Sequence, residues 1–166
     1  MGITLDALVA QVANQLLEKN LMLATAESCT GGWVSEVLTA MPGSSRWFEG
    51  GVVSYSNAVK HRLLGVPRSV LEKRGAVSEA VAKAMAAGAV NCLGSDIALA
   101  ITGIAGPGGG SETKPVGLVW IGWALPSGVV AKQFLFEGDR QAVREQSVVM
   151  ALQELVALLE NLGDGE

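Results

Sequence analysis

The sequence predicts a single-domain α/β protein, a three-layer α/β/α sandwich around a mixed, partly antiparallel sheet. Three observations support this prediction. Amphipathic helical segments alternate with short apolar strand segments over the first part of the chain. Two strand-like segments separated by a short turn then indicate an antiparallel hairpin, and a long helical pattern follows it. Alternating strands and helices are typical of a parallel sheet covered on both faces, to which the hairpin adds antiparallel strands.

The bulk composition narrows the class of protein. The 166 residues suit one domain, predicted as 1–166 with its core at about 5–159. Apolar residues make up 49% and charged residues 17%, which excludes disorder for most of the chain. A net charge of −4 and a pI near 5.0 exclude a basic nucleic-acid-binding surface. The low charge content also predicts self-association into a homo-oligomer.

The cellular location is predicted from membrane-spanning and signal segments, which the sequence does not show, and from the cysteines. No apolar run is long enough to span a membrane, and no basic segment of a signal peptide is visible. The two cysteines, Cys29 and Cys92, lie far apart without metal-ligand spacing, as expected of free thiols in a reducing compartment. We therefore expect a cytoplasmic protein without contact to membranes.

The first part of the chain predicts helices and strands in alternation. A stripe of apolar side chains marks the first helix, and short apolar runs between glycine- and proline-containing turns mark the strands. The second helix is expected to begin at Ser28 or Thr30, since hydroxyl side chains favour helix N-termini. The expected elements are a helix over 4–20, a strand over 21–26, a helix to Ala40, a strand over 48–56, and short helices over 57–65 and 67–74.

The second part of the chain continues the alternation and then changes to a hairpin. Ser78 suits the N-cap of a long amphipathic helix, and Asp139 suits the N-cap of the last one. A glycine-rich loop, with no core residue expected beyond Ile104, follows the third strand. The expected elements are a helix over 78–93, a strand over 96–102, a loop over 103–115, hairpin strands over 116–125 and 129–136, and a helix over 139–159.

The segment TAESCTGG, Thr25–Gly32, concentrates reactive side chains between a strand and a helix. Ser28 can be read as an N-cap or as a nucleophile. Two glycines in a first helical turn would cost about 1 kcal/mol each, which favours a functional reason such as close approach of a ligand. If Ser28 is the nucleophile, backbone N–H groups after it would stabilise an oxyanion, and the candidate donors are Thr30, Gly31 and Gly32.

A nucleophilic serine requires a base, and Lys60 is the main candidate. Ser–Lys pairs are variants of the catalytic triad that need a neutral lysine, held so by burial or by another cation. Tyr55, five residues earlier, carries a phenol that could relay the proton. His61 is the only histidine and is expected to be a solvated surface residue. Each of these residues also has a structural reading, with Lys60 as a solvated helix lysine and Tyr55 as a half-buried strand aromatic.

The segment TGIAGPGGGSETKPVG, residues 102–117, is the second unusual stretch. It lacks the Gly-Lys-Ser/Thr ending of a phosphate-binding P-loop, and a strand rather than a helix follows it, so neither that motif nor a dinucleotide-binding motif fits. Its bare N–H groups at a strand end predict a loop that binds an anion or a polar ligand. A flexible surface loop is the alternative.

Two arginines at the start of the last helix form a third candidate group. Arg140 and Arg144 lie one turn apart, where cations oppose the helix dipole. An external anion such as phosphate would explain this placement. Pairing with the nearby carboxylates of Glu137, Asp139 or Glu145 explains it equally well.

Taken together, these motifs resemble the CinA C-terminal domain family. The motifs occur in one order along the chain, as TAESCTGG, SYSN with a lysine after it, AVSE, TGIAGPGGGSETKPVG and GDR…VR. The resemblance covers about Leu5 to Leu159, and the chain is similar to the stand-alone form of this domain. Characterised members of the family are nicotinamide-nucleotide amidases.

The resemblance implies hydrolysis of the carboxamide of nicotinamide mononucleotide to nicotinic acid mononucleotide and ammonia, without a metal or another cofactor. It implies a small nucleotide as the partner, and neither nucleic acid nor membrane. Ser28 would be the nucleophile, and Tyr55 and Lys60 would complete a Ser–Tyr–Lys system. The residues implied to bind the substrate are Gly103, Gly106, Gly108, Gly109, Arg140 and Arg144.

Three other hypotheses fit the same residues. An amidase could use Cys29 with Glu27 and Lys60, because a thiolate at a helix N-terminus has a lowered pKa. A non-catalytic nucleotide-binding module would use Ser28 only as a helix cap. A partner domain of an oligomer would use tryptophans as anchors, although buried tryptophans are the simpler reading. These tryptophans are Trp33, Trp47, Trp120 and Trp123.

Overall fold

The structure, a computed structural model, describes residues 4–162, so the first three and last four residues of the predicted 1–166 domain lie outside the described residues. Five strands form one sheet in the order β2-β1-β3-β4-β5. Strand β1 pairs in parallel with β2 and β3, and β3, β4 and β5 pair antiparallel, which confirms the predicted mixed sheet. The strands are β1 (Leu23–Glu27), β2 (Phe48–Val53), β3 (Ile97–Gly103), β4 (Leu118–Leu125) and β5 (Gly128–Leu135).

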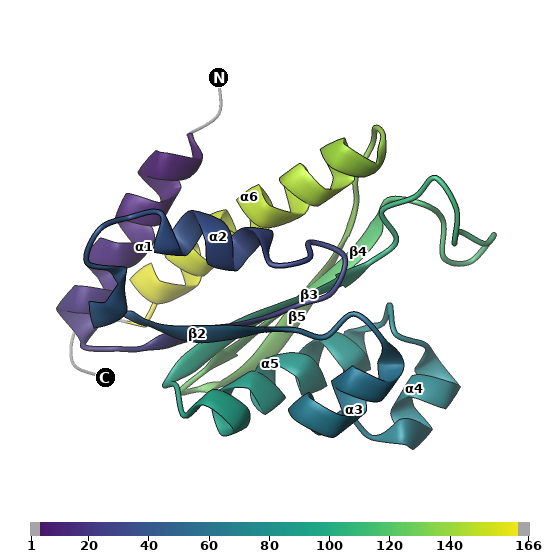
Figure 1. Cartoon of the computed structure of the whole chain (residues 1–166), viewed down its shortest axis with the longest axis horizontal. Coiled ribbons are helices and arrows are strands. Elements are labelled where there is room, and N and C mark those ends of the chain that lie inside the picture. Colours follow the sequence, from purple (N-terminus) through teal and green to yellow (C-terminus); the bar gives the residue numbers. More distant parts are fainter. Residues whose placement is uncertain (1–3, 163–166) are drawn as a thin grey trace.

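Helices cover both faces of this sheet, as Figure 1 shows, and the predicted three-layer arrangement is confirmed. One face carries α1 (Leu5–Lys19), α2 (Trp33–Thr39) and α6 (Arg140–Glu160). The other face carries α3 (Asn57–Leu64), α4 (Arg68–Arg74) and α5 (Glu79–Leu93). The predicted helix boundaries hold best where a side chain caps the helix. Thr4, Ser56, Ser78 and Asp139 each accept a hydrogen bond from an N–H of the first turn of α1, α3, α5 and α6.

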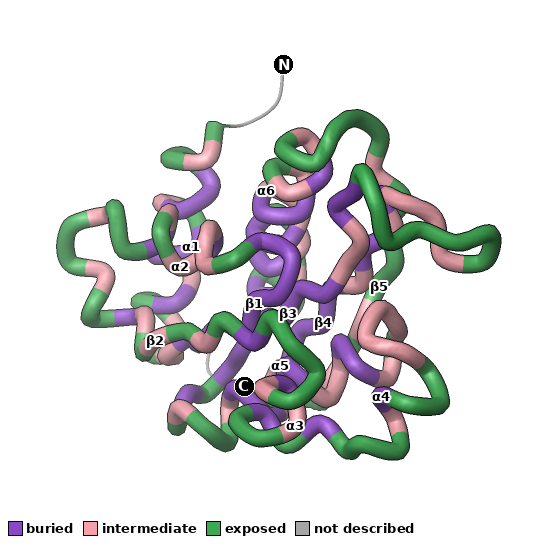
Figure 2. Tube along the Cα trace, turned by 45° about the vertical axis from the view of Figure 1, so that its right-hand side comes forward, coloured by how far each residue is buried: buried purple, intermediate pink, exposed green. Residues whose placement is uncertain are grey.

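The core is divided by the sheet into two apolar clusters. Because side chains alternate along a strand, Leu23 of β1 packs with α1 and α6, whereas Ala24 and Ala26 pack with α5. Figure 2 shows the result as a buried centre running through β1, β3 and β4. Small residues on the α5 side let this helix approach closely, and at Gly88 the backbone of α5 lies against the carbonyl of Leu64 in α3.

Three local predictions differ from the structure. Helix α2 begins at Trp33, so the expectation of a start at Ser28 or Thr30 is wrong. Gly31 and Gly32 have φ values of 60° and 103°, in the left-handed region that glycine tolerates, and they form a turn before the helix rather than its first turn. Ala105 is buried, so the glycine-rich loop does contribute to the core beyond Ile104.

Between residues 4 and 162, no helix combines the length and the hydropathy that a bilayer crossing requires.

Candidate active site

A cavity of about 180 Å³ lies at the carboxyl ends of β1 and β3, beside the segment that leaves β2. This is the edge at which α/β sheets bind ligands, because the loops that follow the parallel strands converge there. The wall of this cavity, which we call the active-site cavity, consists of Ser28, Cys29, Tyr55, Asn57, Lys60, Ala76, Val77, Thr102, Gly103, Ala105 and Arg140. Six of the residues selected from the sequence, counting the alternative nucleophile Cys29, are therefore brought together: Ser28, Cys29, Tyr55, Lys60, Gly103 and Arg140.

Ser28 is the first residue after β1 and is held by the neighbouring strand. Its N–H donates a hydrogen bond to the carbonyl of Ile101 in β3, at 3.0 Å. Because successive side chains of an extended chain point to opposite faces, Glu27 points toward α2 and Ser28 points toward α3. The hydroxyl of Ser28 thus faces the active-site cavity and not the helix that it was expected to cap.

Lys60 is the fourth residue of α3, and its side chain turns inward instead of into solvent. Its Nζ lies 2.9 Å from the Oγ of Ser28 and donates to the backbone carbonyls of Ser54 and Tyr55, at 2.8 and 2.9 Å. The residue is only 1% exposed. Burial lowers the pKa of Lys60 from 10.5 to about 8, because the charged ammonium loses its hydration. The reading of Lys60 as a solvated helix lysine is therefore wrong.

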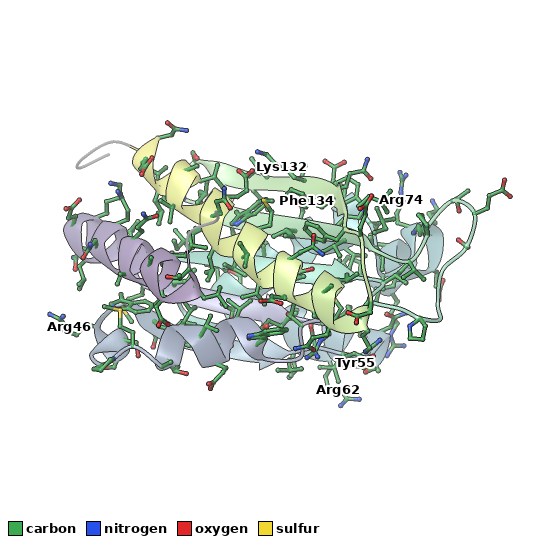
Figure 3. All side chains as sticks on the ribbon, turned by 90° about the horizontal axis from the view of Figure 1, so that it is seen from above. Arg46, Tyr55, Arg62, Arg74, Lys132 and Phe134 are labelled. Carbon is green, nitrogen blue, oxygen red and sulfur yellow. The ribbon has the colours of Figure 1, made fainter. Side chains whose placement is uncertain are left out.

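Tyr55 contributes its backbone, not its phenol, to the lysine. The side chain is 64% exposed, so the reading as a half-buried aromatic is wrong. Its hydroxyl lies 3.5 Å from a terminal nitrogen of Arg140, at the rim of the cavity, and Figure 3 places Tyr55 beside the first turns of α6.

Glu27 explains why α2 starts later than predicted. Its buried carboxylate accepts hydrogen bonds from the backbone N–H groups of Val34 and Ser35, and from the hydroxyls of Thr30 and Ser35, at 2.7 to 3.0 Å. Negative charge is favourable at a helix N-terminus, so a strand residue takes the capping role that we expected of Ser28. The carboxylate is fully engaged on the α2 face, on the opposite side of the sheet from Lys60.

Cys29 does not have the environment of a nucleophilic thiolate. Burial raises the pKa of the Cys29 thiol from 9.0 to about 11, mainly because the thiolate would be desolvated. The expectation of a lowered pKa at a helix N-terminus is wrong, since α2 begins four residues later. With Glu27 on the other face of the sheet, the set of Cys29, Glu27 and Lys60 is not assembled.

The two arginines of α6 have different surroundings. A terminal nitrogen of Arg140 donates to the carbonyl of Gly106 at 2.7 Å, and the side chain lines the active-site cavity. Arg144 instead donates its Nε to the carbonyl of Cys29 at 3.0 Å and a terminal nitrogen to that of Thr30 at 3.3 Å. Its guanidinium also lies 5.5 Å from the ring centroid of Trp33. Within residues 4–162, neither arginine forms an ion pair with Glu137, Asp139 or Glu145.

The predicted backbone groups are only partly available. The N–H of Gly31 donates to the carbonyl of Ser28 at 3.1 Å, whereas the N–H groups of Thr30 and Gly32 make no such bond. None of these three residues belongs to the wall of the cavity. In the glycine-rich loop, Gly103 lines the cavity and Gly106 holds Arg140, while Gly108 and Gly109 are exposed.

Sequence reasoning missed several wall residues. Thr102 donates its hydroxyl to the carbonyl of Ala76 at 2.9 Å, which ties the end of β3 to the turn before α5. The position of Thr102 at a strand end, next to the glycine-rich loop, was a usable signal, whereas Asn57 and Val77 carried none. His61 is half-buried with its Nδ1 2.9 Å from the carbonyl of Val66, so it is not the solvated residue that we expected.

The four tryptophans that were considered as anchors of a partner domain differ in burial. Trp47 and Trp123 are buried in the core, which leaves only Trp33 and Trp120 partly exposed. Among the described residues, no group of three His, Cys, Asp or Glu side chains is placed to hold a metal ion.

Comparison with known proteins identifies the family to which the chain belongs. The model of the CinA C-terminal domain matches residues 5–159. A protein from Pseudomonas putida, named nicotinamide-nucleotide amidohydrolase PncC, is 47% identical over 154 residues, which cover 93% of this chain and 96% of that protein. A protein of the same name from Enterobacter agglomerans is 50% identical over 151 residues, which cover 90% of this chain and 92% of that protein.

Solved structures agree with this relationship. The crystal structure of the competence damage-inducible protein A from Klebsiella pneumoniae subsp. pneumoniae superposes with a TM-score of 0.92 at 36% sequence identity. The superposition covers 95% of this chain and 98% of that one. The α/β fold described above is therefore the fold of that crystal structure.

Proposed function

Because this chain belongs to the CinA C-terminal domain family, we propose that it is an amidohydrolase that converts nicotinamide mononucleotide to nicotinic acid mononucleotide and ammonia. One observation carries the proposal. A buried lysine with a lowered pKa lies in hydrogen-bond contact with a serine hydroxyl, inside a cavity at the ligand-binding edge of the sheet. An activated nucleophile held beside a base is one arrangement that hydrolyses amides, and Ser–Lys pairs are a known variant of it.

The hydrogen bonds of Lys60 support its role as the base. A neutral amine has two N–H donors and one lone pair. The carbonyls of Ser54 and Tyr55 can only accept, so together they take both N–H groups of the neutral amine. The lone pair is then directed at the third neighbour, the hydroxyl of Ser28, which is able to donate. Two backbone carbonyls thus orient the amine for proton transfer.

The proposed reaction proceeds in two halves. The Oγ of Ser28 bonds to the carboxamide carbon while its proton moves to Lys60 Nζ, and the tetrahedral oxyanion receives backbone N–H donors from the turn after Ser28. The N–H groups of Thr30 and Gly32 make no backbone hydrogen bond, whereas that of Gly31 donates to Ser28. Because neither Thr30 nor Gly32 lines the cavity, this contact requires the turn to shift toward the carboxamide. The ammonium of Lys60 returns the proton to the amide nitrogen, the C–N bond breaks and ammonia leaves. Water then attacks the ester and gives a proton to Lys60, which passes it to the Ser28 oxygen as the C–O bond breaks.

The far end of the substrate needs an anion site, and Arg140 is the better placed of the two arginines. It lines the cavity, and one of its terminal nitrogens is committed to Gly106, which leaves the other near the hydroxyl of Tyr55. Binding energy from the phosphate can orient the carboxamide over Ser28. We assign Arg144 to holding the turn after Ser28, since its guanidinium is bound to two carbonyls of that turn.

The test is an ammonia-release assay with purified protein and nicotinamide mononucleotide. We expect turnover in the unchanged protein, a loss of at least about 100-fold in Ser28→Ala, and near-normal turnover in Cys29→Ala, the neighbouring matched control. Binding of the nucleotide without ammonia release by the folded protein would replace the amidase by a non-catalytic nucleotide-binding module. Activity lost in Cys29→Ala and kept in Ser28→Ala would reverse the assignment of the nucleophile.

A further inference from the structure

A second cavity, of about 610 Å³, lies beside the active-site cavity on the α5 face of the sheet. Its floor includes Leu118 and Trp120 of β4 and Gln133 of β5. Trp120 pairs directly with Thr102 of β3 on one side and with Gln133 on the other, so these three side chains form one row on one face. Thr102 at one end of the row lines the active-site cavity, and Trp120 and Gln133 line the second cavity.

The charges around this second cavity are unusual for the chain. Three of the 12 Lys and Arg residues surround it, although the protein carries a net charge of −4: Arg74 at the end of α4, Lys83 in α5 and Lys114 from the glycine-rich loop. Glu79 is the one acidic residue in the wall, and it pairs with Lys83 at 3.0 Å. The cavity therefore keeps a surplus of positive charge, which attracts anions.

The three cations differ in what they already bind. The ammonium of Lys114 donates to the backbone carbonyl of Arg74 and so holds the glycine-rich loop against the end of α4. The guanidinium of Arg74 forms no ion pair within residues 4–162. Figure 3 shows Arg74 at the end of the molecule away from Arg46. Arg74 is thus the group in this wall that is most available to an anion.

The chemistry of the floor narrows the ligand. The half-buried indole of Trp120 offers a flat surface for a heteroaromatic ring, and the amide of Gln133 can both donate and accept. A planar base next to a phosphate matches an indole surface flanked by cations, and the volume lies in the range of small-molecule sites. We infer that this cavity binds a nucleoside phosphate, with its base against Trp120 and its phosphate toward Arg74 and Lys83, at a position separate from Ser28.

The two cavities share a thin wall. Val77 lines both of them, and the carbonyl of the preceding Ala76 is held by the hydroxyl of Thr102 at 2.9 Å. A ligand on Trp120 therefore lies next to the active site without contacting Ser28 or Lys60. The inference adds a site to the proposed amidase and does not depend on hydrolysis taking place.

The test follows the indole N–H signal of Trp120 in a ¹H–¹⁵N spectrum, assigned by its loss in Trp120→Phe. Titration with adenosine 5′-monophosphate should shift this signal in a saturable way. The double variant Arg74→Ala/Lys83→Ala should weaken binding at least about tenfold, because two charged contacts to the phosphate are lost. Lys73→Ala is the matched control, since Lys73 neighbours Arg74 in α4 but does not line the cavity, and it should bind as the unchanged protein does.

Further arms identify what is bound and where. An unshifted Trp120 signal at millimolar nucleotide, or equal affinity in the double variant, would overturn the site. An equal response to inorganic phosphate alone would overturn the nucleoside part of the inference. A shift that disappears in Arg140→Ala and persists in Arg74→Ala/Lys83→Ala would place the nucleotide in the active-site cavity instead. Ammonia release is measured on the same samples, and its absence alone would count against the amidase and not against this site.

Discussion

At the scale of single residues, the proposed chemistry depends on the protonation of Lys60. Burial holds its pKa at about 8, and only the neutral amine can accept the proton of Ser28. We therefore expect kcat/KM for nicotinamide mononucleotide to rise about tenfold per pH unit below pH 8 and to level off above it. Ammonia release measured across this range checks the prediction. A flat profile would exclude a base with this pKa.

Lys60→Arg separates charge from size at the same position. A guanidinium stays protonated at every accessible pH, so this variant should lose at least about 100-fold in kcat, as much as Lys60→Ala loses. Tyr55→Phe is a useful comparison, because the carbonyl that contacts Lys60 is kept and only the rim hydroxyl is removed. Substantial activity in Lys60→Arg would contradict a role as base.

The same lowered pKa makes stability depend on pH. The folded-state pKa of about 8 is below the value of 10.5 for an unperturbed lysine, so between these values the unfolded chain binds more protons than the folded one. The free energy of unfolding of the unchanged protein should rise with pH in this window, relative to Lys60→Met, by about 1–3 kcal/mol. Urea unfolding of both proteins at pH 7, 8.5 and 10 provides the measurement. If the difference between their free energies of unfolding fell with pH, it would contradict a lowered pKa of Lys60.

At the scale of elements, α6 places two arginines one turn apart for two purposes. Arg140→Ala should raise KM for nicotinamide mononucleotide about tenfold or more and affect nicotinamide riboside, which lacks the phosphate, much less. Arg144→Ala should lower kcat for both substrates by a similar factor, because the turn after Ser28 loses its two carbonyl contacts. Steady-state kinetics with the two substrates decide the matter. A phosphate-selective loss in Arg144→Ala would reverse the two roles.

The contact between α3 and α5 holds the lysine in place. A Cβ at Gly88 would clash with the backbone carbonyl of Leu64, so the two helices would have to move apart. Gly88→Ala should therefore destabilise the protein by about 1–3 kcal/mol, more than the gain of up to about 1 kcal/mol in helix propensity. Thermal unfolding measures this loss. Gly108→Ala is the control, because no atom lies within 4 Å of its Cβ and its Tm should not change.

These elements also show what the sequence could predict. Apolar periodicity and capping residues place α1, α5, α6 and the β4–β5 hairpin within a few residues, because both are local properties. The start of α2 was missed because Glu27, a residue of the preceding strand, caps the helix from outside it. Lys60 had two readings because its helix has a polar pattern, and the contact that decides between them joins it to Ser28, 32 residues earlier in the chain. The reach of Arg144 to Cys29 likewise depends on tertiary structure.

At the scale of the whole molecule, the open edges of the sheet bear on self-association. Val53 of β2 and Val130 and Leu135 of β5 lie on the two edge strands and are 40% to 65% exposed. Edge strands with exposed apolar side chains are prone to pair with other chains. We therefore still predict a homo-oligomer. Sedimentation equilibrium should give a multiple of 17.1 kDa, and Leu135→Lys should shift it toward that mass if β5 is the interface. A single mass of 17.1 kDa at all concentrations would contradict the prediction.

The parallel pairing of β1 with β2 sets the distance between the hydroxyl of Ser28 and the amine of Lys60. Ser28 and Ser54 each directly follow the end of one of these strands, and Glu27 pairs with Val53 in an unbroken register back to Ala24. The single irregularity of this ladder lies at the opposite end, between Leu23 and Ala24. A slip of one strand along the other by one residue would displace the amine from the hydroxyl by about 3.3 Å and break their contact. The backbone hydrogen bonds between β1 and β2 thus fix the spacing between the hydroxyl and the amine, and the one register shift of this pair lies at the end of the strands away from Ser28 and Ser54.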